Sequence, residues 1–125
     1  MDDQPVGTIV GQGWDEPWYR VRTEAFQASF LPGAGEDLEA VCNVDAEVQL
    51  TADGSRWSAT LFTVTEVERL MKRWSHTGEE RGGSYFWCSD ALIVGHPGIG
   101  NMTRALIELI DAGDLGRILQ RLDGD

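Results

Sequence analysis

The chain has 125 residues, 42% of them hydrophobic, and is predicted to fold as a single domain over residues 1–125 with a core of ordinary size. Its formal net charge of −11 disfavours direct binding to the phosphate backbone of nucleic acids. No apolar run reaches the roughly 18 residues of a membrane span, so we expect no contact with a membrane.

The negative charge is concentrated in the first part of the chain. Residues 1–54 contain 11 acidic residues, and Arg20 and Arg22 are their only basic ones. Such a segment can attract a basic protein partner, although acidity also serves solubility alone.

The cysteines and histidines indicate neither a disulfide nor a metal site. Cys42 and Cys88 lie in strand-like apolar patterns, and the N-terminal residues lack the pattern of a signal peptide. We therefore expect free, buried thiols in a reducing cytoplasm. His76 and His96 have no ligand spacing to each other or to the cysteines, so no zinc and no cofactor are expected.

The first third of the chain is predicted to form strands. Residues 6–10 are typical of a short strand, and a Gly-Gln-Gly turn at 11–13 follows. Within residues 18–31 the apolar alternation slips by one position near residues 23–25. This slip indicates a β-bulge or a break between two strands, and a short helix over 24–30 is the weaker alternative.

The clearest strand is predicted over residues 38–50, where apolar and polar residues alternate. One face of this strand is expected to pack inward, and the other to be solvated and acidic. The solvated face carries Glu39, Asn43, Asp45, Glu47 and Gln49. An Asp53-Gly54 turn then predicts a hairpin whose second strand covers residues 56–63.

An amphipathic helix is predicted after this hairpin. Thr65 and Glu68 have the spacing of a capping box at its start, and Gly78 marks its end. The apolar stripe of this helix consists of Val67, Leu70, Met71 and Trp74. Because Trp74 closes the stripe, we expect it in the core, where truncation to alanine costs about 3–5 kcal/mol.

The longest apolar run, residues 84–94, is predicted to be a strand opened by the pair Gly82-Gly83. Both of its faces are apolar, so we expect it to be covered on both sides and to lie at or near the centre of the sheet. Asp90 is the single charge in this run. We expect this carboxylate to be paired with an arginine or with amide donors and to be structural; an unpaired carboxylate would have a raised pKa and suit a general acid.

The loop at residues 95–101 leads into the last part of the chain. It lacks the Lys and Ser/Thr that a phosphate-binding loop requires after Gly100. Helical spacing then predicts a helix over 102–110, ended by Gly113, and a short final helix capped by Asp114. Early strands and late helices predict an α+β fold, with a single layer of helices packed on one face of a mostly antiparallel sheet of four or five strands.

The tryptophans divide between core and surface. Trp57, Trp74 and Trp87 are expected to fill the core, whereas Trp14 lies in a turn-rich acidic segment and is the tryptophan that we most expect to be exposed.

Two kinds of function fit these features. The leading hypothesis is a non-enzymatic protein that binds a basic protein partner, as an inhibitor or immunity protein would. The residues expected to contact this partner are Trp14, Trp18, Glu39, Asp45 and Glu47. The alternative is a small-molecule binding module or a small hydrolase. Its pocket would contain Tyr85, Trp87, Asp90 and His96.

Overall fold

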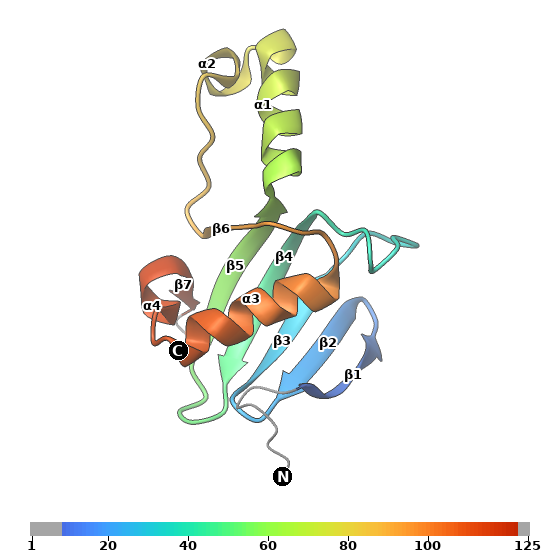
Figure 1. Ribbon diagram of the computed structural model, residues 1–125, viewed down its shortest axis with the longest axis vertical. Coiled ribbons are helices and arrows are strands. Elements are labelled where there is room, and N and C mark those ends of the chain that lie inside the picture. The colour runs from blue at the N-terminus through green and yellow to red at the C-terminus, as the bar shows by residue number, and fades with distance from the viewer. Residues whose placement is uncertain (1–8, 123–125) are drawn as a thin grey trace.

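A seven-stranded sheet forms the centre of the molecule in the computed structural model, which describes residues 9–122 (Figure 1). Five strands follow one another as an antiparallel meander, namely β1 (Ile9–Asp15), β2 (Trp18–Thr23), β3 (Phe26–Leu31), β4 (Asn43–Leu50) and β5 (Arg56–Thr63). The far side of β5 pairs with two short strands, the parallel β6 (Ala91–Val94) and the antiparallel β7 (Gln120–Leu122). The α+β class is therefore as predicted, but four or five strands was too few.

The slip in alternation near residue 23 is a break between β2 and β3. The hydroxyl of Thr23 accepts the amide protons of Ala25 and Phe26, at 3.2 and 3.1 Å, and donates to the carbonyl of Phe26 at 3.2 Å. These bonds close the turn and reset the alternation, so that Val21 and Phe26 are both buried.

The first predicted strand was wrong in extent. Residues 6–8 lie outside the described part of the chain, and the expected turn at 11–13 is instead the middle of β1, paired with β2.

β4 also begins later than predicted, at Asn43 rather than Leu38. The reason is that the preceding backbone bonds to the loop before the third helix. The carbonyl of Leu38 accepts the amide proton of Ile99 at 2.9 Å, and that of Val41 accepts the amide proton of Gly98 at 2.7 Å. Residues 38–41 therefore anchor that loop and do not extend the sheet.

The core lies between the sheet and two helices, α3 (Ile99–Asp111) and α4 (Leu115–Ile118), which cover one of its faces (Figure 1). The sheet contributes alternate residues of its central strands, including Phe26, Ala28, Phe30, Val44, Ala46, Val48, Ala59 and Leu61. The helices contribute Ile99, Met102, Leu106 and Leu115. This burial of apolar area is the main favourable term in folding.

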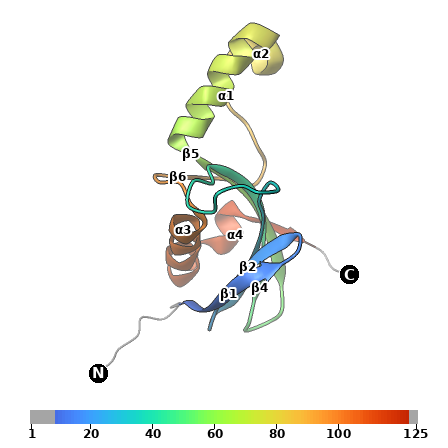
Figure 2. The ribbon, with the colours of Figure 1, turned by 90° about the vertical axis from the view of Figure 1, so that its right-hand side faces the viewer.

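Helices α1 (Val64–Thr77) and α2 (Glu79–Gly83) do not belong to that layer. They extend beyond the end of β5, and residues 84–90 return from them to β6 (Figures 1 and 2). We call residues 64–90 the arm. Trp74 stacks on Phe86 at 5.7 Å between ring centroids, and Phe86 meets Phe62 of β5 edge to face at 4.9 Å. Trp74 thus packs inside the arm and lies outside the main core, contrary to expectation.

The start of α1 differs from the predicted capping box by two residues. Thr63, not Thr65, is the N-cap, and its hydroxyl accepts the amide proton of Glu66 at 3.1 Å. The carboxylate of Glu66 is buried and accepts two bonds from the Arg69 guanidinium, both 2.8 Å long. It also accepts a bond from the side chain of Asn43 at 3.2 Å and thereby ties α1 to β4.

The expected central strand over residues 84–94 is wrong. Only residues 91–94 form a strand, and β6 pairs with β5 alone. The aromatic residues before it belong to the arm. Phe86 is half-buried, but Trp87 is 70% exposed and is therefore not in the core. The glycine pair serves the arm too: Gly83 has φ of 81°, and a Cβ there would collide with the carbonyl of Met71.

Candidate partner-binding face

One face of the sheet carries no helix among the described elements (Figure 2). In β4, Asp45 and Gln49 are exposed and Glu47 is half-buried, while the alternating apolar residues point to the core, as predicted. Side chains of neighbouring strands that share this orientation make up what we call the open face.

The open face is organised in rows across the strands. At the end near the arm, Asp45 of β4 lies opposite Thr60 of β5. Thr60 in turn lies opposite Ala91, the residue that follows Asp90. At the other end the register aligns Arg22, Gln27, Gln49 and Arg56. The face is therefore acidic at one end and basic at the other, whereas the sequence predicted only that the solvated face of the strand over residues 38–50 is acidic.

The acidic end contains two carboxylates that share one hydroxyl. Thr60 Oγ1 lies 3.2 Å from Asp45 Oδ1 and 3.0 Å from Asp90 Oδ1, and Ser58 Oγ donates to Asp90 Oδ2 at 2.8 Å. Since Thr60 has one hydroxyl proton, it can donate to only one carboxylate at a time. Neither carboxylate forms an ion pair within residues 9–122, unlike Glu47, which pairs with Arg56 at 2.9 Å.

Asp90 is held mainly by hydroxyl and thiol donors, and the arginine that we expected is not among its partners in residues 9–122. Burial raises the pKa of this carboxyl, but hydrogen bonds from Ser58, Thr60 and Cys88 outweigh it and hold the pKa below its ordinary value. Asp90 is therefore ionised at neutral pH and does not have the raised pKa of a general acid.

Asp90→Asn is expected to lower the free energy of unfolding by about 1 kcal/mol at pH 7, because it weakens charge-assisted bonds from Ser58 and Thr60. A lowered folded pKa gives a contribution that is full above the unfolded pKa, about 3.9, and is lost as pH falls through the folded pKa. Urea unfolding of both proteins at pH 7 and below pH 3 should show the difference shrink in acid. A difference that grows in acid would contradict the assigned protonation.

Exposed aromatic side chains lie close to the acidic end. In the arm segment that leads to Asp90, Trp87 is 70% exposed and Tyr85 is 47% exposed. Trp18 is on the open face by alternation, and the guanidinium of Arg20 lies 5.8 Å from its ring. Trp14 is 47% exposed, as expected, but its alternation puts it on the opposite side of the sheet from Trp18.

Glu39 is not part of the open face, although the sequence grouped it with Asp45 and Glu47. It lies in the turn before β4 and borders a shallow depression with Pro97 and Arg104, next to α3. The strand begins after Glu39, so the period of two that relates the other carboxylates does not apply to it.

Asp90 and His96, the titratable residues of the hydrolase alternative, do not lie together. Asp90 precedes β6 and His96 follows it, so about 13 Å of extended strand separates the two ends. His96 borders a separate depression of about 290 Å³ that is also lined by Arg104 and Glu108. The possible pocket of Tyr85, Trp87, Asp90 and His96 therefore divides between two parts of the surface.

Several residues of this surface were missed by sequence reasoning. Thr60 was counted only as part of a strand, and Arg22 only as a charge. Their alignment depends on the register of four strands, which no local pattern specifies. Glu66 could have been found, because Thr63 and Glu66 also have capping-box spacing.

Within residues 9–122 no three histidine, cysteine, aspartate or glutamate side chains form a metal-binding group. The helices of this part of the chain are all too short or too polar to cross a bilayer. Cys42 and Cys88 are free and half-buried. No protein-family model matches the chain, and no curated protein or solved structure is significantly similar to it.

Proposed function

We propose that this protein is a non-enzymatic interaction protein that binds a basic protein partner through the acidic end of its open face. One observation carries the proposal. Asp45 and Asp90 flank Thr60 on an uncovered sheet face, and neither has an ion-pair partner among the described residues. Asp90 also accepts bonds from Ser58 and Cys88, but Thr60 cannot donate to both carboxylates at once, and an arginine or lysine of a partner would supply the missing donor.

The surroundings of this pair favour a protein over a small ligand. Trp87 and Tyr85 are exposed in the segment that leads to Asp90, and such side chains often dominate binding energy at protein interfaces. The net charge of −11 would also speed the approach of a basic partner, an effect that salt weakens. An inhibitor or immunity role in the cytoplasm is consistent with this chemistry.

Asp45→Lys tests the proposal, because Asp45 is exposed and its replacement should change the free energy of unfolding by only about 0.5 kcal/mol. Partner capture from lysate of the source cells by the immobilised variant is expected to fall at least about tenfold, the effect of 1.4 kcal/mol. Capture by the unchanged protein should weaken as salt is raised.

Asp111→Lys is the matched control, since it makes the same charge change at an exposed position on α3, across the sheet. It should retain most of the capture. Equal losses in both variants would reduce the effect to overall charge, and unchanged capture by Asp45→Lys would refute the acidic end as a binding surface.

A further inference from the structure

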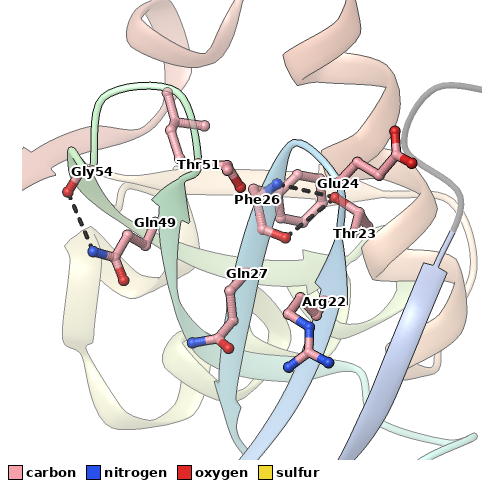
Figure 3. Close-up of a pocket in the computed structure, with 9 residues that line it drawn as sticks. Arg22, Thr23, Glu24, Phe26, Gln27, Gln49, Thr51 and Gly54 are labelled. Atoms are coloured by element: carbon pink, nitrogen blue, oxygen red, sulfur yellow. Dashed lines mark hydrogen bonds between the residues drawn. The ribbon is translucent and has the colours of Figure 1, made fainter.

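The basic end of the open face forms a depression of about 400 Å³ (Figure 3). Arg22, Gln27 and Gln49 line it from three adjacent strands, and the register places them in one row. In Figure 3 the side chains of Arg22 and Gln27 extend in the same direction, while the carboxylate of Glu24 points away from them. The polar group that extends alongside the Arg22 guanidinium is therefore the amide of Gln27 and not a carboxylate.

Arg22 differs from the other two arginines of the open face. Arg20 pairs with Asp15 at 2.9 Å, and Arg56 pairs with Glu47 at 2.9 Å. Arg22 has no acidic partner among residues 9–122, in a chain with 21 acidic and 10 basic residues. A guanidinium without a carboxylate partner among residues 9–122 is available to an external anion.

The backbone of β1 leaves room for this guanidinium. A Cβ at Gly11 would lie 3.1 Å from Arg22 Nη2, so the arginine rests over the glycine. Gln49 Nε2 donates to the carbonyl of Gly54 at 3.4 Å, which uses one of its two protons. Arg22 can thus donate two hydrogen bonds to one carboxylate, in the bidentate geometry typical of arginine. The side-chain amide of Gln27, on the next strand, can donate a further hydrogen bond.

We propose that this depression binds a carboxylate, and that the carboxylate is an aspartate or glutamate side chain of the partner protein. The identity of the occupant rests on the proposed function; the chemistry of the site does not. The depression is open, which suits a side chain that projects from a protein surface. Strand spacing puts Arg22 roughly 17 Å from Asp45, so a partner with a basic and an acidic residue at that separation would dock in one orientation.

The first test uses blocked glutamate, N-acetylglutamate N-methylamide, as the probe and blocked glutamine as its neutral counterpart. Titration followed by NMR should shift the side-chain signals of Arg22 and Gln27 with glutamate only. Arg22→Gln should weaken this binding at least about tenfold, whereas the exposed Arg73→Gln on the arm should not. No shifts, equal shifts with glutamine, or an unchanged response in Arg22→Gln would each overturn the site.

The second test identifies the source of the carboxylate. In partner capture, Arg22→Gln should reduce binding severalfold, and Arg73→Gln should not. Unchanged capture by Arg22→Gln would overturn the assignment to the partner's side chain. Failure of the proposed function is separately visible, because the titration with blocked glutamate requires no partner.

Discussion

Glu66→Ala is expected to lower the free energy of unfolding by about 2–3 kcal/mol, although Glu66 is not a member of the main core cluster. Glu66 is 5% exposed, and its carboxylate accepts bonds from Arg69, Asn43 and Cys42. Removing it deletes charge-assisted bonds worth about 1.5–3 kcal/mol, and the exposure of Arg69 limits the loss because water can solvate that group. Urea unfolding measures the change.

Glu68→Ala provides the control, because Glu68 is exposed on the same helix and should change stability by less than about 0.5 kcal/mol. Hydrogen bonds from Arg69 lower the pKa of Glu66 despite its burial. Its contribution is therefore full above the unfolded pKa, about 4.3, and is lost as pH falls through the folded pKa. An effect of Glu66→Ala no larger than that of Glu68→Ala would show that the arm is not anchored through this carboxylate.

The predicted faces of β4 were correct because alternation alone determines them. Val44, Ala46 and Val48 are buried, and Asp45 and Gln49 are exposed, as a period of two requires. The same pattern continues upstream to Leu38, yet those residues bond to the loop before α3. Alternation predicts on which face of the sheet a strand residue lies. It does not show where the backbone stops pairing with a neighbouring strand and forms hydrogen bonds with a loop instead.

The aromatic run over residues 84–94 misled for a related reason. Two apolar faces are typical of a covered central strand, but here Phe86 packs on Trp74 of the arm and Trp87 remains exposed. An apolar run indicates that its side chains will be buried or will bind something. The local sequence does not show whether they pack against the sheet core, against a helix of the same chain or against another protein.

The open face shows the limit of single-sequence reasoning about sites. Asp45 was identified from alternation, and Asp90 from its isolation among apolar residues. Their common neighbour Thr60 comes from a strand 15 residues after Asp45 in sequence, and only the pairing of β4, β5 and β6 brings the three together. At the basic end of the open face, Arg22, Gln27 and Gln49 are likewise brought together only by the pairing of β2, β3 and β4.

Phe30→Ala is expected to have the largest effect on stability of any change considered. Phe30 is fully buried in β3, between β2 and β4, and its truncation leaves a cavity that costs about 3–5 kcal/mol. This is a large share of the roughly 5–15 kcal/mol that stabilises a typical domain, so the variant should be barely folded at 25 °C. Circular dichroism and urea unfolding would detect this loss.

Trp74→Ala, in contrast, should leave the sheet cooperatively folded. Trp74 is half-buried and stacks on Phe86 within the arm, so its loss should raise amide hydrogen exchange over residues 64–90 and leave β2 to β5 protected. Hydrogen exchange by mass spectrometry separates the two regions. If Trp74→Ala unfolds the sheet as completely as Phe30→Ala, the arm and the sheet form one cooperative unit, and the arm cannot reorganise around a partner without unfolding the sheet that holds Asp45 and Arg22.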